Sequence, residues 1–141
     1  MTEVVSKIRK IERNDQEIYQ YLSDFRNLDS IIPEDKIKNW TSEEETCQFT
    51  IDGVGKAGMR IVEKEPYKLI KISSYKETPF EFNFWLQLKQ VEEQDTRIRL
   101  TLRAKLNPIM KAMVSGQLQK GMDAIVDKLA DFFNEKKDLQ G

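Results

Sequence analysis

The clearest pattern in the chain is a strict alternation of apolar and polar residues between positions 80 and 106. Polar residues and Trp85 separate the apolar ones, and an acidic turn at residues 92–95 divides the pattern in two. Side chains alternate between the two faces of a strand, so this pattern predicts two antiparallel strands with one apolar face. The apolar positions are Phe80, Phe82, Phe84, Leu86, Leu88, Ile98, Leu100, Leu102, Ala104 and Leu106.

The same period of two, in shorter runs, covers residues 36 to 75 and predicts strands at 36–41, 45–51, 59–65 and 68–75. A β-branched segment at 4–12 predicts a further strand. Between it and the others, Asn14 with Glu17 three residues later forms a capping-box pattern for a first short helix. A second short helix is expected at 23–31, before Pro33.

The C-terminal segment predicts one long helix. Asn107 is a good N-cap and Pro108 suits the first helical position, and nothing obvious breaks the helix before about Lys137. Bulky residues follow from Ile125 to Phe133, whereas Met110, Met113, Gly116 and Met122 are flexible or small, which predicts a packed end and an open end. The apolar stripe is expected to comprise Met110, Val114, Leu118, Gly121, Met122, Ile125, Leu129 and Phe132.

Length and composition suit a single domain, expected at residues 1–137 with a short tail at 138–141. The net charge is −1, which argues against a surface devoted as a whole to nucleic acid. No apolar run approaches the roughly 20 residues of a membrane span, and a cytoplasmic location is expected. Cys47 is the single cysteine and there is no histidine, which excludes Ser-His and Cys-His nucleophile pairs and the usual zinc sites. We expect no metal and no cofactor.

Residues 53–58, GVGKAG, match the dinucleotide-binding pattern G-x-G-x-x-G. That pattern binds phosphate only when a helix follows it, because the helix N-terminus supplies the N–H donors. Here the strand-like MRIVEKEP follows, so we interpret the glycines as a turn at the start of a strand.

The order of elements, from KIERNDQEIYQYLSD through GVGKAGMRIVEKEP to the capped final helix, resembles the START-related (SRPBCC, polyketide cyclase/lipid-transport-like) superfamily. The resemblance covers nearly the whole chain. It implies an α+β helix-grip fold: a curved seven-stranded antiparallel sheet, two short helices after strand 1, and a long C-terminal helix gripped by the sheet. It also implies an apolar cavity between the sheet and this helix. The resemblance further implies members that carry lipids, sterols, quinones or polyketides, and a minority that act as cyclases or dehydratases.

The first functional hypothesis is therefore non-catalytic binding or transport of a hydrophobic small molecule (lipid, quinone or polyketide-like) between the sheet and the final helix. Arg9, Trp40 and Tyr75 are candidates for a polar rim that orients the ligand. The expected cavity lining is Met59, Ile61, Ile70, Ile72, Phe82, Phe84, Leu100, Leu102, Met110, Val114 and Leu118.

The register of the first strand stays open at this point. If the strand keeps the register of Ile11, then Lys7 and Arg9 point inward and can pair with an anionic head group. The opposite register places Ser6, Ile8 and Lys10 on that side.

Two alternatives belong to other functional classes. An enzyme of the cyclase or dehydratase kind needs a titratable group in the cavity, and without histidine the candidates are Glu63, Tyr75, Arg9 and Lys111. An interaction module would use the outer face of the sheet to bind RNA, a ribosome or an anionic membrane surface. The basic residues with outward parity are Arg60, Lys64, Lys71, Arg97, Arg99, Arg103 and Lys105.

Overall fold

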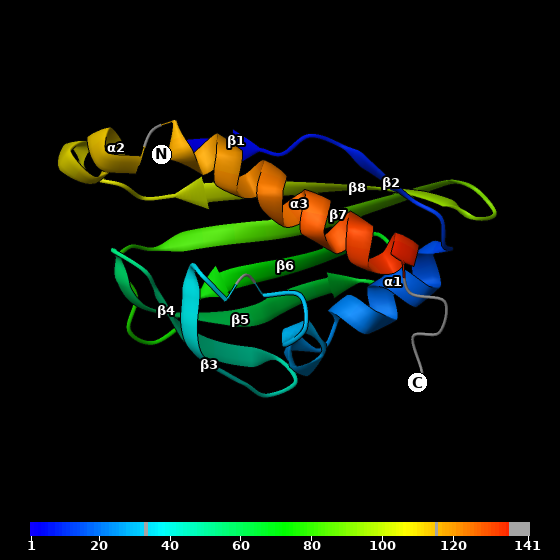
Figure 1. The fold of residues 1–141 in the computed structure, drawn as a ribbon, viewed down its shortest axis with the longest axis horizontal. Coiled ribbons are helices and arrows are strands. Elements are labelled where there is room, and N and C mark those ends of the chain that lie inside the picture. The colour runs from blue at the N-terminus through cyan, green and yellow to red at the C-terminus, as the bar shows by residue number, and fades with distance from the viewer. Residues whose placement is uncertain (33, 115, 136–141) are drawn as a thin grey trace.

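The computed structural model describes residues 1–32, 34–114 and 116–135. One antiparallel sheet forms a layer, and the long C-terminal helix α3 crosses its inner face (Figure 1). The strands are β1 (Thr2–Val5), β2 (Arg9–Ile11), β3 (Ile37–Ser42), β4 (Thr46–Ile51), β5 (Gly55–Glu65), β6 (Leu69–Ser74), β7 (Phe82–Glu92) and β8 (Asp95–Ala104). The helices are α1 (Asp15–Leu22), the 3₁₀ helix η1 (Phe25–Leu28), α2 (Pro108–Val114) and α3 (Gln117–Glu135).

The sheet order is β1-β8-β7-β6-β5-β4-β3, so consecutive strands from β3 to β8 form hairpins and the first strand returns to pair with the last. The predicted helix-grip architecture is confirmed. The described residues end at Glu135, so the predicted domain boundary after residue 137 and the tail at 138–141 lie outside them.

The predicted first strand is interrupted. Both β1 and β2 pair with β8, but Val5 lies opposite Thr101 and Arg9 opposite Ile98, so three residues of one strand face two of the other. Such a bulge shifts the side-chain alternation by one position. Each of the two registers left open by the sequence therefore holds for half of the strand: Ser6 is buried in the first half, and Ile11 in the second.

The two short helices begin at their predicted caps. The Asn14 side chain accepts a hydrogen bond of 2.8 Å from the Glu17 amide and donates one of 3.1 Å to its carboxylate. The Asp24 carboxylate accepts from the Arg26 amide at 2.9 Å and starts η1, which is a single 3₁₀ turn. Ile18, Leu22 and Phe25 project from this segment into the core.

The C-terminal helix is not continuous, which corrects the prediction of one helix from Pro108. It starts as expected, because the Asn107 side chain accepts from the Met110 amide at 2.8 Å. However, α2 ends at Val114 and α3 begins at Gln117, and Gly116 has φ of +84°. A left-handed glycine ends a helix readily because it has no Cβ to clash.

The break also rotates the buried face of α3 from its predicted position. The predicted stripe places Met110 and Val114 on the same face as the apolar residues of α3, which requires one continuous helix. Gly116 interrupts that helix. Ile125 is consequently 41% exposed and Gly121 lies at the surface, both against prediction. The buried residues of α3 are Met122, Val126, Leu129, Ala130 and Phe133. Met122 was expected at the open end, but it is buried in the core.

The glycine segment at 53–58 is a turn followed by a strand. Gly53 and Gly55 have φ of +79° and +134°, and β5 begins at Gly55. A Cβ at Gly58 would collide with the carbonyl oxygen of Tyr75, so the residue is fixed by close backbone approach. The turn interpretation is confirmed.

Candidate functional site

The inner face of the sheet changes from packed to partly exposed along its length. At one end Leu86, Leu88, Ile98 and Leu100 are at most 7% exposed, and they belong to the same core as the C-terminal half of α3. Toward the other end of β7 and β8, Phe82, Phe84 and Leu102 are only half-buried. The sheet therefore presents an apolar wall that is partly uncovered at one end.

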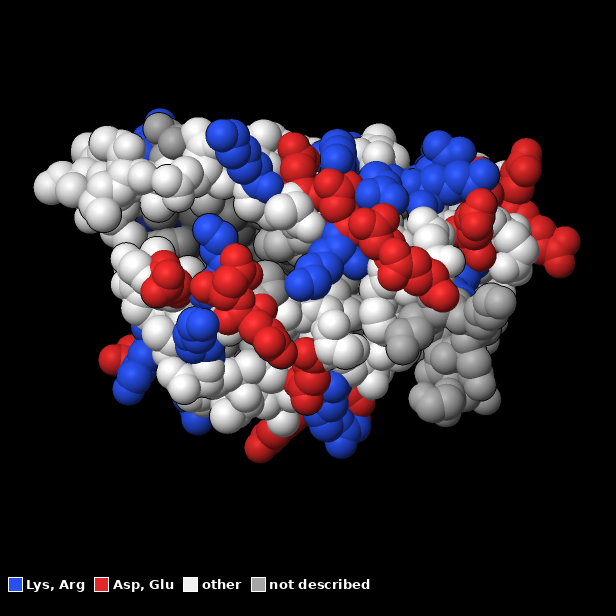
Figure 2. All heavy atoms as spheres, viewed as in Figure 1, with Lys and Arg blue, Asp and Glu red and all other residues white. Residues whose placement is uncertain are grey.

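Helix α2 and the start of α3 lie at this same end of the sheet (Figure 1). No residue of α2 is buried: Met110 and Val114 are half-buried, and so is Leu118 at the start of α3. In the space-filling view, the helix side is hollowed between α2, the start of α3 and the β3–β4 side of the sheet (Figure 2). The hollow lies on the side where the sequence places its small and flexible helix residues.

The predicted cavity residues fall into two groups. Ile61, Ile70, Ile72 and Leu100 are buried members of the main core. The others are half-buried, so they are the members that a ligand can reach with the least rearrangement: Met59, Phe82, Phe84, Leu102, Met110, Val114 and Leu118.

Of the predicted polar rim, the structure turns Trp40 toward the inner face and Tyr75 away from it. The Trp40 ring stacks on the inward-facing Phe49, with ring centroids 5.6 Å apart. The Tyr75 ring lies on the outer side, 5.2 Å from the Arg60 guanidinium and 5.3 Å from the Lys76 ammonium group. Tyr75 is thus not part of the rim, while Trp40 lies on the inner face and packs against the core.

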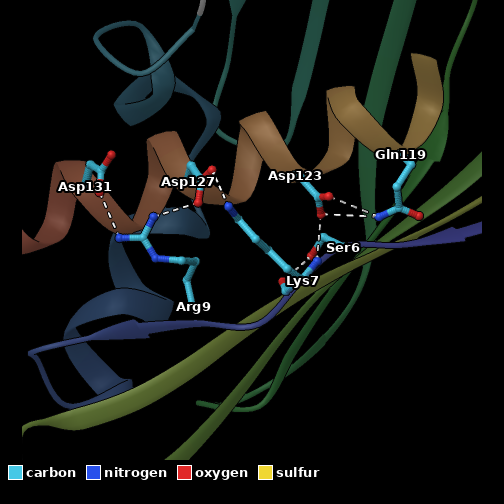
Figure 3. A network of polar contacts seen from close by, with 7 residues as sticks. All are labelled: Ser6, Lys7, Arg9, Gln119, Asp123, Asp127 and Asp131. Atoms are coloured by element: carbon cyan, nitrogen blue, oxygen red, sulfur yellow. Dashed lines mark hydrogen bonds and ion pairs between the residues drawn. The ribbon is translucent and has the colours of Figure 1, made fainter. Parts of the chain in front are cut away.

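Arg9, the third rim candidate, is engaged by α3 (Figure 3). Its guanidinium donates to Asp127 at 2.6 Å and to Asp131 at 2.9 Å. An anionic head group would have to displace these carboxylates to reach it.

The same acidic face of α3 holds the segment between β1 and β2. The Lys7 ammonium group lies 2.7 Å from Asp127, and the Lys7 amide donates to Asp123 at 2.7 Å. Hydrogen bonds from Lys7 and then Arg9 lower the pKa of the Asp127 carboxyl. The spacing of the three aspartates, at i, i+4 and i+8, was a signal in the sequence for one charged helix face, but their partners were not predictable from it.

The catalytic candidates are not gathered on the inner face. The alternation placed Glu63 with Met59 and Ile61, but a bulge after Ile61 puts Glu63 opposite the outward-facing Lys71, and Glu63 is exposed. Lys111 is exposed on α2. Cys47 does face inward, but burial raises the pKa of its thiol to about 12, so it is not a thiolate at neutral pH.

The outward-facing cations are largely occupied by neighbours on the sheet. The Trp85 ring lies between the Lys71 ammonium, at 5.5 Å, and the Arg103 guanidinium, at 5.7 Å. Arg103 also pairs with Glu3 at 2.7 Å, and Arg97 with Asp95 at the same distance. These contacts favour a solvated, internally paired face over one held ready for a polyanion.

A pocket of about 270 Å³ opens at the ends of β6, β7 and β8. Among the predicted cavity residues it shares only Phe82, and most of its lining residues are polar or charged, such as Ser73, Asn83 and Lys105. It is therefore distinct from the apolar wall. Within the described ranges, no cluster of acidic or sulfur ligands suits a metal ion, and no helix is long and apolar enough to cross a membrane.

Comparison with known proteins places this architecture. No protein-family model and no curated protein matches the sequence. Three solved structures resemble it. Norcoclaurine synthase from Thalictrum flavum, with dopamine and hydroxybenzaldehyde, has a TM-score of 0.74 at 11% identity, covering 97% of this chain and 88% of that one. A START superfamily protein from Mycobacterium smegmatis has a TM-score of 0.74 at 14% identity (94% of this chain, 97% of that one), and the di-domain ARO/CYC protein BexL of the BE-7585A biosynthetic pathway has 0.70 at 15% (93% of this chain, 46% of that one). With its curved antiparallel sheet and gripped helix, this chain has the fold of the START-related superfamily.

Proposed function

We propose that this protein binds an apolar small molecule, without catalysing a reaction, between the open end of the sheet and α2 with the start of α3. The observation that carries the proposal is the half-buried state of apolar residues on both sides of this space. Phe84 and Leu102 supply the sheet side, and Val114 and Leu118 the helix side. Moving such surfaces out of contact with water contributes about 25 cal/mol per Å², so an apolar ligand gains by covering them.

Two further observations support this proposal: the first supports a ligand site in this fold, and the second favours binding without catalysis. A protein of the same fold has been solved with two small aromatic molecules, which is consistent with a ligand site in this architecture. In this chain the inward-facing thiol of Cys47 has a raised pKa, and the Glu63 carboxylate faces outward. Neither group is placed to carry a proton to or from a ligand at the apolar wall.

The test is the binding of a fluorescent fatty-acid probe to the wild type and to Val114→Trp. The indole would occupy the space that we assign to the ligand, so probe binding should fall at least about tenfold while the protein stays folded. Met113→Trp is the matched control, because Met113 is the neighbouring residue of α2 and is 68% exposed. The control should bind like the wild type. Absence of probe binding in the wild type, or equal binding by both variants, would show that the ligand site is not here.

A further inference from the structure

Trp40 faces inward because of a bulge in the edge strand β3. Lys38 pairs with Thr50 and Thr41 with Gln48, so Asn39 and Trp40 together lie opposite the single residue Phe49. Asn39 takes the left-handed conformation, with φ of +56°. Asparagine tolerates this conformation better than most residues. The bulge reverses the alternation and brings the Trp40 side chain to the face of Ile37 and Phe49.

The indole nitrogen of Trp40 is buried and has no hydrogen-bond acceptor among the described residues. Among the described residues, it is the only buried side-chain nitrogen or oxygen atom without a hydrogen-bond partner. The ring itself is well held, because it stacks on Phe49 at an interplanar angle of 27° and packs against the core. A rotation of the ring toward another acceptor would therefore disturb this stacking.

A buried donor without an acceptor costs about 1–3 kcal/mol. Bulk water does not reach the atom, and an acceptor carried by a molecule that enters the apolar interior would remove this cost. A pure hydrocarbon cannot supply it. A carboxylate held at this buried atom is disfavoured, because a buried charge needs a cation, and Arg9 and Lys7 are already paired with α3. A fatty-acid probe is therefore expected to keep its head group in solvent. A neutral carbonyl oxygen accepts a hydrogen bond and carries no charge, so it meets both conditions.

We propose that the ligand is a largely apolar molecule with a neutral carbonyl oxygen, and that the Trp40 indole N–H donates to this oxygen. This inference rests on the proposed function and narrows its ligand class. Trp40 is then the residue that selects a carbonyl compound over a hydrocarbon of the same shape, because only the carbonyl compound satisfies the buried donor.

The test compares two probes of nearly equal shape, acetylnaphthalene and isopropenylnaphthalene, which differ by a C=O against a C=CH₂ group. Both should displace the fluorescent fatty acid, and the ketone should bind about 5- to 100-fold more tightly. Trp40→Phe keeps an aromatic ring on Phe49 but removes the N–H, so the preference should fall below about twofold. Trp85→Phe changes the other tryptophan, which lies on the outer face, and should keep the preference.

Nuclear magnetic resonance gives a readout in the wild type that does not depend on any variant folding. The indole N–H signal of Trp40, assigned by its persistence in Trp85→Phe, should move downfield with the ketone and less with the hydrocarbon. If both probes bind equally and this signal responds equally, the carbonyl inference is wrong while the ligand site stands. If neither these probes nor the fatty acid binds, the proposed function is wrong and the inference fails with it.

Discussion

Arg9 of β2 donates a hydrogen bond of 2.6 Å to Asp127 of α3, a residue 118 positions later in the sequence. The bond joins the first strand segment to the final helix (Figure 3). Together with Lys7, it fixes how α3 lies along the β1–β8 edge of the sheet. The charged residues of this segment therefore hold the gripped helix in place.

The Asp127 pairs should give a defined acid dependence of stability. Lys7 and Arg9 hold the pKa of Asp127 below its ordinary value of 3.8, so the ionised form stabilises the fold above that pH. This contribution is lost as the pH falls through the lower pKa of the folded state. Asp127→Asn should lower the free energy of unfolding by about 1 kcal/mol at neutral pH, and the difference from wild type should shrink toward zero in acid. Urea unfolding across pH measures this; a difference independent of pH would contradict it.

The packed end of α3 should carry more stability than the cap of α2. Leu129 is 5% exposed, and Leu129→Ala should cost about 2–5 kcal/mol by leaving a cavity. Asn107→Ala removes the acceptor for the Met110 amide and should cost only about 0.5–1 kcal/mol, since α2 buries no residue and is separated from α3. Chemical denaturation of the two variants gives the comparison. Equal losses would mean that α2 is as firmly packed as α3.

Two glycine substitutions should act in opposite directions. Gly58→Ala should be destabilising, because the added Cβ meets the Tyr75 carbonyl and forces β5 and β6 apart. Gly121→Ala is the counterpart on the exposed side of α3, where no atom lies within 4 Å of the new Cβ, and it should stabilise by about 0.5–1 kcal/mol. Thermal unfolding of both variants checks the pair. A neutral Gly58→Ala would show that the two strands approach less closely at this point.

The sequence predicted the elements whose signals are local. The alternation at 80–106 became β7 and β8, and the caps Asn14 and Asn107 start helices as expected. These succeed because a period of two and an N-cap depend only on neighbouring residues. The order of the elements was then enough to indicate the fold.

The sequence could not predict where β-bulges shift the alternation of side chains between the two faces. Bulges at residues 6–8, at Asn39 and after Ile61 decide the faces of Arg9, Trp40 and Glu63. Each bulge depends on pairing with a distant strand, so no local pattern marks it. The candidate site is affected most, because these bulges decide which of its polar members face the interior. The helix break at Gly116 had a local signal, the glycine itself, which was interpreted as flexibility within a continuous helix.

The outward arginines should be dispensable for ligand binding. Arg97, Arg99 and Arg103 lie on the face of the sheet opposite the apolar wall, and each contacts an outer-face neighbour: Asp95, Gln87 and Glu3, respectively. Replacing all three with glutamine should therefore leave fatty-acid probe affinity within about twofold of wild type. These exposed pairs contribute at most about 1 kcal/mol each, so the triple variant should remain folded.

The same proteins can be assayed with labelled single-stranded RNA and with anionic vesicles. Because the cations are already paired, we expect no measurable association of the wild type at about 0.15 M salt. Wild-type association that the triple variant loses, with a steep salt dependence, would instead identify the outer face as a functional surface.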